Sequence, residues 1–96
     1  MSELIDLSHD GKKGAIVYMV EGEKLAEMTF VFAGEGQFII DHTEVDPSMK
    51  GKGIGNRLLD KAVDYARENG LKILPLCPFA ASVFRKNKDI RDVLKQ

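Results

Sequence analysis

The sequence predicts an α+β fold, with an antiparallel meander, one crossover helix, a splayed parallel strand and a C-terminal helix. Two observations support this fold class. Apolar residues recur at strand spacing through residues 4–45, in runs separated by short glycine-containing links. From Ile54 they recur at helical spacing, and another strand-like apolar run follows the helix. The order strand, helix, strand requires a crossover connection, which favours a parallel or splayed pair at that place.

Four strands are expected in the first half of the chain, over residues 4–7, 14–20, 25–32 and 37–45. The short links between them favour antiparallel pairing of neighbours. The run 14–20 is apolar on both faces of the pleat, so we expect both of its faces to be covered. In the run 25–32 the two faces differ, because Met28 and Phe30 alternate with Glu27 and Thr29.

A helix is expected to begin near Ile54, where the period of the apolar residues changes. Its apolar stripe consists of Ile54, Leu58, Leu59, Ala62, Val63 and Ala66. Gly70 suits the left-handed residue that ends a helix. A buried strand interrupted by Pro75 is expected over 71–77, and a short helix over 79–87. The charged residues 88–96 would form a frayed helical turn.

Composition bounds the class of protein. A chain of 96 residues predicts a single domain spanning 1–96. The net charge of −1 disfavours binding to nucleic acids or to anionic membranes. Cys77 is the only cysteine, so no disulfide can form within the chain, and a lone thiol fits a reducing compartment. The N-terminus lacks the basic and apolar regions of a signal peptide, which predicts a cytoplasmic protein.

The stretch VDPSMKGKGIGNRLL, residues 45–59, leads into the predicted helix. Glycine occupies positions 51, 53 and 55, and Lys50 and Lys52 add positive charge. A helix N-terminus carries unpaired N–H groups and a partial positive charge, and glycines let a phosphate approach these groups closely. The alternative is a turn whose glycines only allow the chain to reverse. The P-loop and dinucleotide-binding glycine patterns do not match this stretch.

The same stretch resembles motif A of the GNAT superfamily of acetyl-CoA-dependent N-acetyltransferases. The residues that match the motif are Val45, Asp46, Pro47, Gly51, Lys52, Gly53, Ile54 and Gly55. Lys50 replaces the usual Arg or Gln, and Met49 replaces an aromatic residue. The resemblance implies a truncated GNAT-like fold in which the backbone from Lys50 to Asn56 holds the pyrophosphate of coenzyme A. It also implies that the strand end near Val45 pairs with the pantetheine arm.

The resemblance extends to CPFAASVFRK, residues 77–86, which is similar to a later GNAT motif. Cys77 lies where that family often has Asn, and Phe84 lies where it often has the Tyr that protonates the leaving thiolate. The chain looks like small, minimal members that carry HTEV and PLCPF signatures. It is too short for the helix pair and the two final strands that form much of the acceptor site in full-length members.

Three residues are candidates for chemistry. With Pro78 as the first helical residue, Cys77 would be the N-cap, where the helix dipole favours a thiolate. We therefore predict that Cys77 accepts the acetyl group or lines the acetyl pocket; the alternative is an inert, buried thiol. His42 and Glu44 lie two residues apart on one strand face. Either could act as the base that deprotonates the amine or could activate Cys77, or the two could form a solvated ion pair. His9, His42 and Cys77 lack zinc-ligand spacing, so no metal site is expected.

The leading functional interpretation is a small acetyl-CoA-dependent N-acetyltransferase that acts on an amine of a small molecule or a protein. One alternative is a non-catalytic acyl-CoA-binding or sensor module. It is favoured by Phe84 and by the shortness of the chain. A third class is a partner-binding domain in which the glycine loop is only structural.

Overall fold

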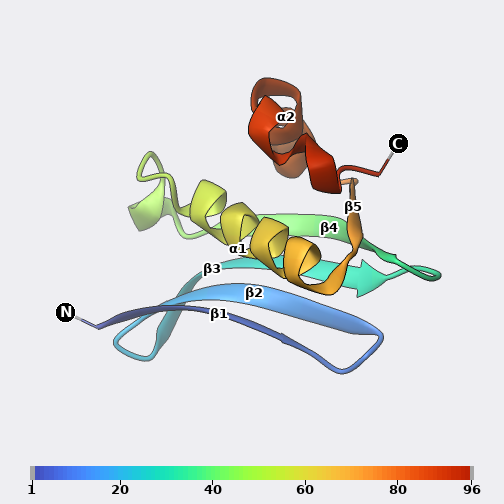
Figure 1. Ribbon diagram of the computed structural model, residues 1–96. Coiled ribbons are helices and arrows are strands. Elements are labelled where there is room, and N and C mark those ends of the chain that lie inside the picture. Colours follow the sequence, from blue (N-terminus) through green and yellow to red (C-terminus); the bar gives the residue numbers. More distant parts are fainter. Residues whose placement is uncertain (1, 96) are drawn as a thin grey trace.

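The computed structural model describes residues 2–95 and confirms the predicted α+β class. A five-stranded sheet has the order β1-β2-β3-β4-β5, and α1 crosses one of its faces (Figure 1). The elements are β1 (Glu3–His9), β2 (Lys13–Val20), β3 (Glu23–Phe32), β4 (Gln37–Val45), the 3-10 turn η1 (Pro47–Met49), α1 (Ile54–Asn69), β5 (Lys72–Pro75), α2 (Pro78–Lys86) and the 3-10 helix η2 (Lys88–Val93).

The first four strands form the predicted antiparallel meander, and β5 pairs with β4 in parallel through the crossover helix α1. The β4–β5 ladder is short and ends where Ile40 faces Pro75. Pro75 cannot donate a ladder hydrogen bond. The next two amides, of Leu76 and Cys77, both donate to the Ile40 carbonyl, at 3.0 and 3.1 Å. The chain then enters α2, so the second half of β4 runs on without β5 beside it.

A β-bulge in β4 decides which side chains face the helix. Thr29 pairs with His42 and Phe30 pairs with Ile40, so Asp41 is the extra residue. Before the bulge, even-numbered residues such as Ile40 face α1. After it, Thr43 and Val45 face α1, because they pair with the buried Met28 and Ala26.

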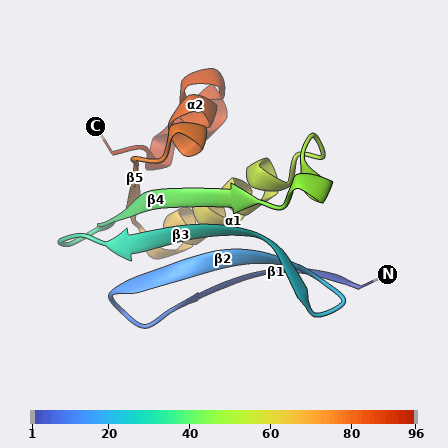
Figure 2. The ribbon, with the colours of Figure 1, turned by 180° about the vertical axis from the view of Figure 1, so that it is seen from behind.

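The core lies between α1 and one face of the sheet. Phe30, Phe38, Ile40 and Ile16 from the strands are at most 1% exposed, and the stripe of α1 packs on them as its period predicts. The opposite face carries no helix within residues 2–95, as the view from behind shows (Figure 2). The expectation that the run 14–20 would be covered on both faces is therefore wrong, because its outward residues are only half-buried.

The remaining differences from the predicted elements have local causes. Strand β1 is longer than 4–7, because polar residues from Glu3 to His9 also pair through their backbones with β2. Strand β5 is shorter than 71–77, because Pro75 ends the ladder. The tail forms η2 rather than a frayed turn, and Ile90 and Val93 within it are buried. Gly70 is left-handed at φ 65°, as expected for the end of α1.

An ion pair ties the first strand to the start of α1. Arg57 donates to the Glu3 carboxylate at 2.9 Å, and the Tyr18 hydroxyl donates to the same carboxylate at 2.7 Å. The Arg57 guanidinium also lies over the Tyr18 ring, 5.5 Å from its centroid. The hydrogen bonds from Arg57 and Tyr18 hold the pKa of Glu3 below its ordinary value of 4.5.

Glu3→Gln should lower stability at pH 7 but not in acid. A carboxyl group whose pKa is lowered by folding stabilises the folded state above its unfolded pKa, and this contribution disappears as the pH falls through the folded pKa. The difference in urea midpoint between the two proteins should therefore be present at pH 7 and be lost in acid, as the pH falls through the lowered pKa of Glu3. Glu35→Gln, in the exposed β3–β4 turn, is the matched control. An equal difference at both pH values would contradict this assignment.

Candidate functional site

The connection between β4 and α1 consists of the 3-10 turn η1 followed by a loop with two left-handed glycines. Asp46 caps η1, because its carboxylate accepts from the Ser48 amide at 2.9 Å and from the Ser48 hydroxyl. These bonds hold the pKa of Asp46 below its ordinary value. Gly51 and Gly53 have φ angles of 80° and 74°, a region that other residues rarely adopt. The Asp46 cap and Pro47 therefore set the conformation at the start of the loop, and the left-handed glycines let the chain change direction before α1 begins.

The N-terminus of α1 is available for an anion. Gly53 is its N-cap and contributes no side-chain hydrogen bond, and the first turn of α1 contains no acidic residue. The first N–H groups of a helix lack intrahelical partners. Lys50 and Lys52 are exposed on the loop that precedes them. The backbone of Ile54, Gly55 and Asn56 thus combines free donors with the positive end of the helix dipole.

A hollow of about 370 Å³ extends from this helix terminus along β4. It is lined by Thr43, Val45, Met49, Lys50, Gly51, Gly53, Ile54, Gly55, Asn56 and Phe79. The predicted loop residues are therefore brought together with the end of β4, although Lys52 does not line the hollow. Phe79 comes from the start of α2. Its ring packs so closely on Gly55 that a Cβ at that position would lie 2.7 Å from the ring.

Cys77 lies where β4 and β5 part. It is the N-cap of α2, as predicted, with Pro78 in the first turn. Its Sγ accepts from the Ala80 amide at 3.3 Å and lies 3.2 Å from Thr43 Oγ1. Its exposed fraction is 4%. Because Thr43 also lines the hollow, the thiol lies immediately behind the wall of the hollow.

His42 and Glu44 share one strand face, as predicted, but that face is not the one that meets Cys77. Their closest atoms, His42 Nε2 and Glu44 Oε2, are 3.9 Å apart, and the two side chains are 63% and 77% exposed. Thr43, between them, points to the opposite face. The structure therefore groups Thr43 with Cys77 and places His42 and Glu44 on the outer side of the same strand.

Two residues of this site were missing from the sequence-based candidates. Thr43 carries the hydroxyl beside Cys77, and Phe79 forms one wall of the hollow. Strand alternation within HTEV gave a signal for Thr43, since it must face away from His42 and Glu44. Phe84 is 2% exposed and belongs to the core.

Two other features were sought among the described residues: a metal site and a membrane-spanning helix. Within residues 2–95, no three His, Cys, Asp or Glu side chains are grouped so that they could hold a metal ion. None of the helices in that range has the length and apolar character that a membrane crossing requires.

Comparison with known proteins identifies the family. Residues 15–93 match the family model for GCN5-related N-acetyl-transferase. Protein NATD1 of Xenopus tropicalis is 26% identical over 87 residues, which cover 90% of this chain and 80% of that protein. A GCN5-like candidate N-acetyltransferase from Staphylococcus aureus is 36% identical and has a TM-score of 0.71, with coverage of 94% of this chain and 87% of that one.

A more distant structure shares the fold. It is a candidate streptothricin acetyltransferase from Bacillus anthracis in complex with acetyl coenzyme A, with a TM-score of 0.63 and 17% identity. The match covers 81% of this chain and 47% of that one. Together, the family model over most of the chain and the Staphylococcus aureus relative show that this chain belongs to the GCN5-related N-acetyltransferase family.

Proposed function

We propose that the protein binds acetyl-CoA in the hollow beside α1 and transfers the acetyl group to an amine. One observation carries this proposal: a single hollow joins the glycine loop and the uncapped N-terminus of α1 to Thr43, whose hydroxyl lies 3.2 Å from the Cys77 thiol. The hollow thus runs from the N-terminus of α1 to the residue that contacts the Cys77 thiol. Acetyl-CoA presents its pyrophosphate and its thioester at separated positions in the same way.

The loop supplies the interactions that a pyrophosphate needs. The N–H groups from Lys50 to Asn56 and the positive end of α1 would hold the negative oxygens. Lys50 and Lys52 add positive charge, and because both side chains are exposed, their ammonium groups can reach the pyrophosphate in several conformations. The pantetheine arm would run past Val45, along the edge of β4 that β5 no longer covers after Ile40. That edge offers backbone groups to the amides of the arm.

Cys77 provides a route through a covalent intermediate. In this route its Sγ attacks the thioester carbonyl carbon, the bond between that carbon and the coenzyme A sulfur breaks, and the thiol proton of Cys77 ends on the released coenzyme A. The amine then attacks the S-acetyl group, the bond to Sγ breaks, and a proton from the amine returns to Cys77. Sγ accepts from the Ala80 amide at 3.3 Å, which fixes its position at the N-terminus of α2.

Titration with acetyl-CoA tests binding and acyl transfer together. We expect amide shifts in 15N-labelled protein for residues 50–56, followed by a mass gain of one acetyl group on the intact chain. Cys77→Ala should keep the amide shifts and lose the adduct. Thr43→Val, which removes the hydroxyl beside the thiol, should slow adduct formation without preventing binding. Absence of shifts in the loop would contradict the binding site, and an adduct that survives Cys77→Ala would contradict the relay.

A second function is an acyl-CoA-binding module without turnover. Phe84, which has no hydroxyl to protonate a leaving thiolate, favours this alternative, as does the low exposure of Cys77. Release of free coenzyme A thiol with a panel of amines separates the two functions. Catalytic release above the one equivalent expected from Cys77 acetylation indicates an enzyme, and a single equivalent or none indicates a binding module.

A further inference from the structure

The sheet face opposite α1, which we call the open face, carries more apolar side chains than is usual for a sheet surface in contact with water. It is formed by the outward residues of the strands. Its half-buried apolar members are Ala15, Val17, Met19, Val31, Ile39 and Leu74. Leu4, across from Met19, is 57% exposed. Antiparallel sheets that face water usually carry polar residues there, so this surface is suited to contact with another molecule.

The open face also has a distinct charge pattern. Strand register places Glu44 opposite Glu27, Glu27 opposite Val17, and Val17 opposite Asp6, in one row across the sheet. The Asp41 carboxylate lies nearby and accepts from the Thr29 hydroxyl at 2.6 Å. The lysines of this face lie toward its ends and its β5 edge, at positions 13, 24 and 72, and Lys72 Nζ donates to the Asp92 carbonyl oxygen. The centre of the open face is therefore acidic and its flanks are apolar.

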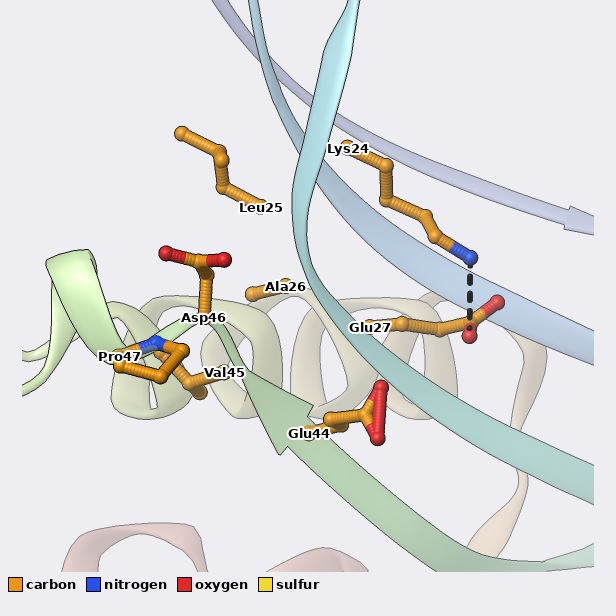
Figure 3. A pocket seen from close by; sticks show the side chains of 8 residues that line it. All are labelled: Lys24, Leu25, Ala26, Glu27, Glu44, Val45, Asp46 and Pro47. Atoms are coloured by element: carbon orange, nitrogen blue, oxygen red, sulfur yellow. Dashed lines mark hydrogen bonds and ion pairs between the residues drawn. The ribbon is translucent and has the colours of Figure 1, made fainter.

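A hollow of about 290 Å³ lies beside Glu27 and Glu44 of the acidic row, where β3 and β4 meet η1 (Figure 3). The Glu27 and Glu44 side chains lie next to each other in this view. Lys24 neutralises only Glu27, with Nζ 3.2 Å from the carboxylate. Glu44 faces His42 at 3.9 Å and is 77% exposed. A cationic group entering the hollow would meet at least one carboxylate without a lysine partner in the described residues.

We propose that the open face docks a basic polypeptide, with a lysine side chain at Glu27 and Glu44 and apolar side chains against Val17 and Met19. This inference rests on the proposed function and names the class of its acceptor as a protein amine. His42 and Glu44 lie on the part of β4 beyond Ile40, where β5 no longer pairs with it, so a polypeptide on this face reaches the strand segment whose other side carries Thr43.

The charge pattern selects this occupant over a second copy of the chain. A two-fold contact whose axis passes through the acidic row would place the carboxylates of one open face opposite those of the other. Like charges placed opposite each other at an interface are strongly unfavourable. A basic segment with apolar neighbours satisfies both the carboxylates and the half-buried apolar side chains.

Peptide titration of 15N-labelled protein tests the docking surface without requiring catalysis. The probe is a capped octapeptide in which two lysines alternate with leucine and valine, and the control peptide carries glutamate in place of lysine. We expect saturable shifts at the amides of Val17, Glu27 and Glu44 with the lysine peptide, reduced by 0.5 M NaCl, and none with the glutamate peptide. Glu27→Lys should weaken binding by about tenfold, because it replaces an attractive charge with a repulsive one.

The control variant is Glu68→Lys, which makes the same charge change on the exposed side of α1 and should leave the peptide affinity unchanged. Glu44→Lys repeats the test at a more exposed position if Glu27→Lys disturbs the strand. Equal binding of both peptides, no shifts on the open face, or equal effects of the variants at 27 and 68 would overturn the inference. Dimerisation through this face, seen by sedimentation and by concentration-dependent shifts without peptide, would also overturn it. Shifts at residues 50–56 with acetyl-CoA report separately on the proposed function.

Discussion

Phe30→Ala should lower the free energy of unfolding by about 3–5 kcal/mol, the usual loss for a buried phenylalanine. The ring is 1% exposed and lies at the centre of an aromatic cluster between the sheet and α1. Its centroid is 5.1 Å from that of Phe38, 5.6 Å from that of Phe32 and 6.5 Å from that of Tyr65. Truncation leaves a cavity lined by side chains of β3, β4 and α1, and the surrounding structure fills such a cavity only in part.

Urea unfolding followed by circular dichroism measures this effect. The midpoint should fall while the slope of the transition stays constant, because the surface exposed on unfolding changes little. Since small domains are stable by about 5–15 kcal/mol, the variant should be close to the limit of folding at 37 °C. Phe30→Leu should lose less, because it keeps most of the apolar volume. The neighbouring Val31→Ala, on the half-exposed open face, should cost under about 1 kcal/mol. Comparable losses at positions 30 and 31 would refute this account of the core.

Most of the fold could be predicted because its signals are local. Strands β2, β3 and β4 are rich in apolar residues and are separated by glycine-containing turns, and α1 carries a continuous apolar stripe that ends at Gly70. The bulge at Asp41 has no such signal. Its position follows from the pairing of β3 with β4, and it reverses the facing of every later residue in β4. Sequence spacing could therefore place His42 and Glu44 on one face without saying which face.

In the candidate site, too, features set by neighbouring residues could be predicted, and contacts between distant segments could not. The glycine loop and the capping position of Cys77 depend on a few consecutive residues, so their geometry could be predicted. The contact of Thr43 with Cys77 joins residues 34 positions apart, and the packing of Phe79 on Gly55 joins two helices. These contacts depend on how β4, α1 and α2 converge, and only the assembled structure contains that information.

Gly53→Val should weaken acetyl-CoA binding by about 100-fold, the loss expected when two charge-assisted hydrogen bonds are removed. Gly53 is the N-cap of α1, and its φ of 74° lies in the left-handed region. A β-branched residue there is strained by at least about 1–2 kcal/mol and will move the backbone toward a more favourable conformation. Because the free N–H groups at the start of α1 follow directly, that movement turns them away from the pyrophosphate. Calorimetric titration with acetyl-CoA measures the change in affinity.

Gly36→Val separates strain from binding, because Gly36 has the same φ of 74° but lies in the β3–β4 turn, outside the hollow. No atom outside the neighbouring residues lies within 4 Å of a Cβ built at either glycine, so both substitutions act through the backbone alone. Both variants should lose similar stability in urea, and only Gly53→Val should lose affinity for acetyl-CoA. If both bind equally well, the glycines of the loop serve only to reverse the chain. If both lose affinity, binding follows global stability and the N-terminus of α1 is not its determinant.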